Sequence, residues 1–212
     1  ENHHPDIIIG YCKVTVSLTT HDAGEITEML ADETATRLTI SDQAITVNSA
    51  GTISVDTANL LEATTSGVIT ASITTSETVD ELNTLTGTGN AYTIVIANGD
   101  ATGSTASEFT SINGKTTVAV NMTNVTALAG SSLADLGTLA TAINASQFSN
   151  AGGLTTIAVT DTTVDATTLA TRIDSYDSIN SGSTTDMTLA SGATIEVEAG
   201  EIAAMLADET AN

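Results

Sequence analysis

The stretch Ala23-Gly-Glu-Ile-Thr-Glu-Met-Leu-Ala-Asp-Glu-Thr-Ala35 returns almost unchanged as Ala199-Gly-Glu-Ile-Ala-Ala-Met-Leu-Ala-Asp-Glu-Thr-Ala211. A close return of this length within one chain is typical of a repeat array. Repeat proteins act more often as scaffolds or extended binding surfaces than as enzymes with a closed pocket. The second copy runs up to the last residues of the sequence, so we expect the chain to be a piece of a longer array.

Between the two copies, short segments of alternating apolar and polar residues recur along the sequence. This period of two predicts short strands, each with only two or three inward-facing residues. The segments are 38–40, 45–47, 53–55, 94–96, 118–122, 157–159, 187–189 and 195–197.

A second kind of segment alternates with these strands. It has a small or acidic start followed by apolar residues at helical spacing. Asp, Ser or Thr ahead of such a run is typical of the N-cap of a helical turn. Residues 132–143 are the clearest example, because Ser132 and Asp135 resemble a capping box and the following leucines share one face. The other segments of this kind are 55–61, 78–85, 104–112 and 164–173.

The two kinds of segment together recur every 22–25 residues or so, within the range of solenoid repeats. We therefore predict an all-β-rich solenoid of the parallel β-helix type, with short helical turns at its corners. A mixed α/β solenoid is the alternative. Residues 1–20 hold the only Pro and the only Cys, so we interpret them as an atypical segment or neighbouring coil. Residues 21–212 are expected to form one continuous array.

The composition fits a thin, layered core. Hydrophobic residues make up 41% of the 212 residues, but aromatic residues only 2%, and there is no Trp. About a fifth of the residues are Thr, well above ordinary usage. Small and β-branched side chains suit narrow β-layers that large rings would not enter.

The charge excludes several partners. The chain has 26 acidic residues against four basic ones and a formal net charge of −22. Nucleic-acid binding needs clustered Lys and Arg, and anionic membranes attract the same residues. Divalent cations remain compatible with this surface, and simple solubility is the alternative explanation. No apolar run is long enough to span a membrane.

Three phrases followed by turns rich in Gly or Thr carry a resemblance: Val79-Asp-Glu-Leu-Asn-Thr-Leu85, Ile143-Asn-Ala-Ser146 and Val164-Asp-Ala-Thr-Thr-Leu169. They resemble repeats of giant acidic surface and adhesin-like proteins of marine bacteria, especially cyanobacteria, often labelled hemolysin-type. The resemblance implies a secreted, cell-surface or filament-forming role without enzyme activity. The family's calcium-binding nonapeptide is absent, because Gly152-Gly153-Leu154 does not continue into it. The family's calcium sites therefore have no counterpart here.

We find no catalytic constellation in the sequence. His3, His4 and His21 lie near the atypical end with Cys12, and a packed cysteine beside exposed histidines explains them more simply than a nucleophile and its base. Paired carboxylates are numerous, but nothing distinguishes one pair as a glycosidase site. We therefore predict that the chain is not an enzyme and holds no catalytic or cofactor-binding residue.

Calcium is the one cofactor for which the acidic residues are suited. It takes six to eight oxygen ligands, which carboxylates and loop carbonyls supply. Two turn regions concentrate carboxylates, although solvated acidic residues on an outer face are the simpler reading. The candidate ligands are Asp161, Asp165, Asp174, Asp177 and Asp186.

These observations favour a structural extracellular protein, a segment of a self-assembling filament, a surface layer or a giant adhesin. A phage or viral fibre shaft and a calcium-dependent adhesion module are the alternatives. The expected partners are further copies of the chain, stacked end to end, and cell-surface glycans. The expected location is extracellular or at the cell surface.

Overall fold

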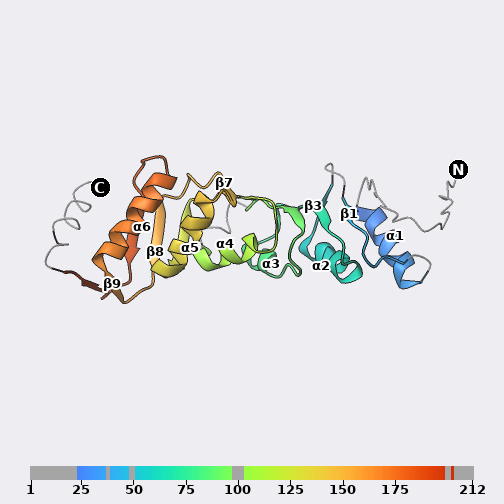
Figure 1. The fold of residues 1–212 in the computed structure, drawn as a ribbon, viewed down its shortest axis with the longest axis horizontal. Coiled ribbons are helices and arrows are strands. Elements are labelled where there is room, and N and C mark those ends of the chain that lie inside the picture. Colours follow the sequence, from blue (N-terminus) through green and yellow to red (C-terminus); the bar gives the residue numbers. More distant parts are fainter. Residues whose placement is uncertain (1–22, 37–38, 48–50, 97–102, 199–201, 203–212) are drawn as a thin grey trace.

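A computed structural model describes residues 23–36, 39–47, 51–96, 103–198 and 202. Within them six helices follow one another along the long axis of the molecule in sequence order (Figure 1). They are α1 (Ala23–Thr34), α2 (Val55–Thr64), α3 (Val79–Asn83), α4 (Ala106–Asn113), α5 (Leu133–Asn144) and α6 (Ala166–Ile179).

The strands alternate with these helices, and every pairing between them is parallel. They form one four-stranded sheet, one three-stranded sheet and two two-stranded sheets. The first sheet contains β1 (Ile45–Thr46), β2 (Thr52–Ile53), β3 (Ile69–Ile73) and β4 (Ala91–Thr93); the second contains β6 (Ala127–Ser131), β8 (Thr156–Val159) and β10 (Asp186–Leu189); the pairs are β5 (Val120–Asn121) with β7 (Phe148–Ser149), and β9 (Thr163–Asp165) with β11 (Thr194–Glu196).

The predicted all-β-rich solenoid is therefore wrong. The described chain is a mixed α/β structure with several small parallel sheets, and these do not join into a closed solenoid, so the mixed solenoid alternative fails as well. The physical reason lies in the capped segments, which continue as helices instead of turning a corner. From α3 onward the helices contain 5, 8, 12 and 14 residues. Strands before and after the longer helices still pair in parallel, β6 with β8 across α5 and β8 with β10 across α6.

Local sequence explains where the helices begin. Side chains at the N-cap accept a hydrogen bond from a backbone N–H in the first turn, which would otherwise lack a partner. Thr78 and Glu81 form a complete capping box, as do Thr105 and Glu108. Ser132 caps α5, as its sequence predicted. The remaining N-caps of this kind are Ser54 and Asp165.

Neighbouring strand–helix units are also linked at the helix starts. The first N–H of α2, at Val55, donates to Glu77 Oε1 at 3.2 Å. The first N–H of α4, at Ala106, donates to Ser131 Oγ at 2.9 Å. The first N–H of α5, at Leu133, donates to Asp161 Oδ2 at 2.7 Å. In each case the acceptor lies 22 to 28 residues further along the chain. A side chain of the following unit therefore accepts the hydrogen bond from the first N–H of the helix before it.

The core is one contiguous aliphatic cluster running through the units. It contains few aromatic residues: Tyr92, Phe109 and Tyr176 are fully buried, and Phe148 is 5% exposed. Helix α1 joins the same cluster through Ile26 and Met29. No described helix is long and apolar enough to cross a membrane.

Candidate functional site

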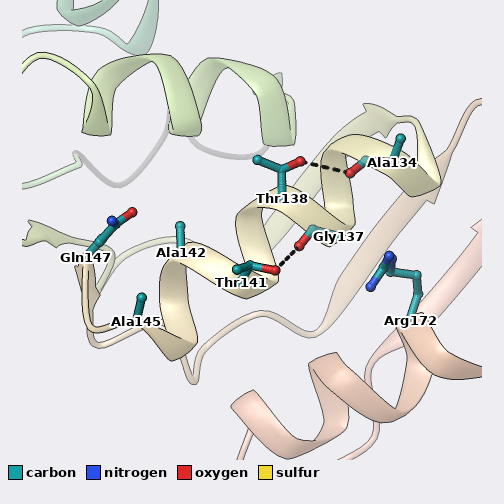
Figure 2. Close-up of a pocket in the computed structure, with 8 residues that line it drawn as sticks. All are labelled: Ala134, Gly137, Thr138, Thr141, Ala142, Ala145, Gln147 and Arg172. Atoms are coloured by element: carbon teal, nitrogen blue, oxygen red, sulfur yellow. Dashed lines mark hydrogen bonds between the residues drawn. The ribbon is translucent and has the colours of Figure 1, made fainter.

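An open groove of about 500 Å³ runs along the outer flank of α5 and reaches α6 (Figure 2). Arg172 from α6 lies at one end of the groove and Gln147, which follows α5, lies at the other. Small side chains of α5 form the wall between them. The complete lining is Ala134, Gly137, Thr138, Thr141, Ala142, Ala145, Gln147 and Arg172.

Arg172 is the charged group of the groove, and it is half-buried. Its Nε donates to the carbonyl oxygen of Leu133 at 3.0 Å. Gly137 makes room for the guanidinium, because a Cβ built on Gly137 would overlap the Nη2 atom of Arg172. Among the residues that the structure describes, Arg172 forms no ion pair with a carboxylate. Its terminal nitrogens are therefore available to another acceptor.

The threonines of the groove have already used their hydroxyl protons. Thr138 Oγ1 donates to the carbonyl of Ala134 at 3.1 Å, and Thr141 Oγ1 donates to that of Gly137 at 2.8 Å (Figure 2). At the far end, Gln147 Oε1 accepts from Asn113 Nδ2 at 3.0 Å. The groove thus presents hydrogen-bond donors at its two ends and mostly methyl groups between them.

A second polar cluster is buried between α2 and β4. Asn90 Nδ2 donates to Glu62 Oε2 at 2.6 Å, and Asn90 Oδ1 accepts from the Ile69 N–H at 2.8 Å. Tyr92 is fully buried nearby, and its hydroxyl has no hydrogen-bond partner among the described residues. Burial, assisted by the negative charge of Glu62, raises the pKa of Tyr92 to about 12. This cluster reads as a structural element with one unsatisfied hydroxyl.

None of the predicted calcium ligands lines the groove, and three of them accept hydrogen bonds within local structure. Asp161 binds the start of α5, and Asp165 Oδ1 accepts from both the backbone N–H and the hydroxyl of Thr168 at 2.8 Å. Those hydrogen bonds lower the pKa of Asp165. Asp177 Oδ1 accepts from the Thr185 N–H at 2.7 Å, while Asp174 and Asp186 are exposed.

These carboxylates do not gather into one ligand set. In the described ranges, no group of three or more His, Cys, Asp or Glu side chains is arranged to hold a metal ion. Calcium binding at the five aspartates stays a prediction. The groove itself was missed from sequence, because Arg172 and Gly137 belong to different repeat units and share no local motif.

The atypical N-terminal segment holds the remaining chemistry of interest. His3, His4, Cys12 and His21 all lie outside the described residues. His3 and His4 lie within residues 1–20, and His21 follows directly, so every histidine of the chain is in its first 21 residues.

Comparison with known proteins found matches at this end of the chain. Residues 1–32 match the model of the pterin 4 alpha carbinolamine dehydratase family. Three curated proteins that carry the name pterin-4-alpha-carbinolamine dehydratase match as well. The protein of Picosynechococcus sp. PCC 7002 is 70% identical over 27 residues, 13% of this chain and 29% of that protein. That of Sulfurisphaera tokodaii is 68% identical over 28 residues, 13% and 30% of the two chains.

The third relative, from Trichormus variabilis, is 62% identical over 34 residues, which are 16% of this chain and 37% of that protein. The chain therefore spans about a third of the length of the curated relatives it matches. No solved structure is a significant match.

These matches overturn the functional interpretation of the sequence. The resemblance to adhesin-like surface proteins is wrong, because the matching family is a dehydratase family. The predicted functions are therefore wrong as well. They are the structural filament, surface layer or adhesin, the fibre shaft and the calcium-dependent adhesion module. The prediction that the chain is not an enzyme is also wrong on this finding. The missed signal was the confinement of every histidine to the first 21 residues.

Proposed function

We propose that residues 1–32 belong to a pterin-4-alpha-carbinolamine dehydratase and that the protein removes water from such a carbinolamine. The observation that carries the proposal is the match of 62–70% identity to proteins of that name. The matched segment includes His3, His4 and His21, so it brings every histidine of the chain into one place in the sequence.

The chemistry of the reaction suits these residues. A carbinolamine carries a hydroxyl group and an amine nitrogen on one carbon. Dehydration breaks the C–O bond and forms a C=N bond. The leaving hydroxyl takes a proton from a general acid and departs as water, while a general base removes the N–H proton. Histidine is the commonest side chain in both roles, and such catalysis contributes about 10²–10⁴-fold in rate.

The described fold supports a connection between this segment and the strand–helix units. The family match extends into α1. The Ile26 and Met29 side chains of that helix are buried in the aliphatic cluster, with exposed fractions of 1% and 6%. Helix α1 thus belongs both to the matched segment and to the packed core of the strand–helix units.

The test is a dehydration assay with the purified full chain and a pterin 4-alpha-carbinolamine. Formation of the C=N bond is followed by ultraviolet absorbance, against the spontaneous rate in buffer. We expect the protein to accelerate the reaction. Changing a histidine that acts as acid or base to alanine should lower the rate by about 10²–10⁴-fold.

His3→Ala, His4→Ala and His21→Ala are made singly. Lys115→Gln is the control, because Lys115 lies far outside the matched segment and should keep the full rate. Circular dichroism establishes that each variant is folded. A rate equal to that in buffer, or full activity in all three histidine variants, would overturn the proposal.

A further inference from the structure

We infer that the groove along α5 binds an elongated monocarboxylate, whose carboxylate lies on Arg172 and whose apolar body lies along the alanines of α5. The inference is independent of the proposed dehydratase function, because the groove lies outside residues 1–32.

The first argument is the state of the guanidinium. Arginine presents five N–H donors in a planar fork that matches a carboxylate. Within the described ranges, Arg172 uses only its Nε, in the bond to Leu133. The chain carries 26 acidic residues, yet no described carboxylate pairs with this half-buried cation. The terminal nitrogens therefore face the groove with a binding capacity that the described fold does not satisfy.

The second argument is Gly137. Glycine in a helix interior costs stability relative to alanine. Here it lies where any Cβ would meet the guanidinium, so the helix accepts a less favourable residue at the one point that lets Arg172 lie against it. This arrangement fixes the charged end of the groove.

The third argument is the shape and polarity of the remaining lining. Residues 134 to 145 extend along α5 for about 16 Å at 1.5 Å per residue. The methyl groups of Ala134, Ala142 and Ala145 contribute no polar atom, and the nearby threonine hydroxyls already donate to the helix backbone. An apolar body of several carbons fits this surface better than a compact, fully hydrated anion does.

Charge selects a single negative group. The net charge of −22 repels polyanions, including nucleic acids and multiply phosphorylated ligands. One guanidinium compensates one carboxylate, so a monoanion is the species that this groove can accept at the lowest electrostatic cost.

The test uses octanoate, octanamide and acetate as probes of the folded full chain at neutral pH. Octanamide keeps the apolar body without the charge, and acetate keeps the charge without the body. Backbone amide NMR shifts of Gly137, Thr138 and Thr141 report occupancy of the groove. We expect saturable shifts with octanoate, and affinities at least about tenfold weaker for both other probes.

Three variants sharpen the test. Arg172→Gln should remove octanoate binding, and Gly137→Ala should weaken it at least about tenfold by displacing the guanidinium while leaving α5 helical. Lys115→Gln, which changes the other described cation outside the groove, should bind as the wild type does. Circular dichroism and thermal unfolding confirm that each variant is folded.

Either of two outcomes overturns the inference. One is that octanoate and octanamide bind equally well, because the carboxylate would then contribute nothing. The other is that octanoate causes no saturable shift at the α5 amides, or causes the same shift in folded Arg172→Gln and Gly137→Ala.

Discussion

Arg172 of α6 lies against Gly137 of α5 so closely that any side chain at position 137 would occupy the place of the guanidinium. The two residues come from different strand–helix units, and the same guanidinium reaches Leu133 at the start of α5. This contact joins α5 to α6 and forms the charged end of the groove.

The first prediction concerns the coupling of these two residues. Alanine favours a helix over glycine by about 1 kcal/mol, and displacement of Arg172 loses a hydrogen bond of similar worth. Gly137→Ala should therefore change the free energy of unfolding little in the wild type. In an Arg172→Ala background it should stabilise by about 1 kcal/mol. Urea unfolding of the four proteins measures the cycle, and identical effects in both backgrounds would contradict the contact.

The two buried tyrosines should respond oppositely to loss of their hydroxyls. The Tyr92 hydroxyl has no hydrogen-bond partner in the part of the chain that the structure describes, so Tyr92→Phe should stabilise the fold by about 1 kcal/mol. The Tyr176 hydroxyl donates to the carbonyl of Leu136 at 3.0 Å, so Tyr176→Phe should destabilise it by about 1 kcal/mol. Chemical unfolding tests the pair, each variant serving as the other's control, and effects of the same sign would refute the assignment.

Tyr92 also predicts an alkaline limit to stability. Its pKa is raised to about 12 in the folded protein, chiefly by burial, against about 10 in the unfolded chain. The folded state therefore retains the proton longer. The stability that this pKa difference gives to the fold is fully present below about pH 10 and is lost as the pH rises towards 12. Tyr92→Phe should lose less stability over this range than the wild type does, as measured by unfolding at pH 9 to 12.

Asn90 should not tolerate substitution, because its side chain is only 2% exposed and hydrogen-bonds to two partners. Asn90→Ala leaves the Ile69 N–H unpaired and should cost about 2–3 kcal/mol. Asn90→Asp keeps an acceptor for Ile69 but sets a second carboxylate against Glu62. Its stability should fall as the pH rises above about 4, because like charges favour the protonated form in the fold.

The matched control for Asn90 is Asn113→Ala, whose side-chain bond to Gln147 is exposed. That variant should change stability by no more than about 0.5 kcal/mol. Urea unfolding at pH 4 and pH 7 provides the comparison. If Asn90→Asp is as stable as the wild type at both pH values, the predicted proximity of residue 90 to Glu62 is contradicted.

Asp161 tests the links between units. Its carboxylate accepts the first N–H of α5, so Asp161→Ala should cost about 1 kcal/mol, whereas Asp161→Asn keeps an acceptor and should cost less. Asp174→Ala removes an exposed carboxylate of α6 and should stay within about 0.5 kcal/mol of the wild type. Thermal unfolding ranks the three, and an equal loss in all of them would rule out a specific cap.

Two caps predict a loss of stability in acid. The Thr78 N–H and then its hydroxyl lower the pKa of Glu81, and the hydroxyl and then the N–H of Thr168 lower that of Asp165. Both contributions are present above the ordinary carboxyl pKa values near 4 and are lost as the pH falls through the lowered ones. The double variant Glu81→Gln/Asp165→Asn should unfold with a shallower dependence on pH below about 5, and an unchanged slope would exclude these caps as its source.

The sequence correctly predicted the local structure of several elements. The helix predicted over residues 132–143 is α5, with Ser132 as its N-cap and Leu133, Leu136 and Leu139 buried on one face. Several predicted strands also lie within a residue or two of those observed, such as β8 and β10. The fold class was wrong because a pattern of caps and apolar spacing marks where a helix begins, but α6 continues for 14 residues where a corner was expected.

The sequence by itself determined the positions of caps and short strands, because these depend on side chains within four residues of the backbone groups they bind. It also held the histidine-bearing segment that matches the dehydratases. Only the tertiary structure decided which distant groups meet: Arg172 with Leu133, 39 residues apart, and Asn90 with Glu62, 28 apart. Such contacts depend on the parallel register between units. The number of residues between the two partners varies because the helices between the strands differ in length.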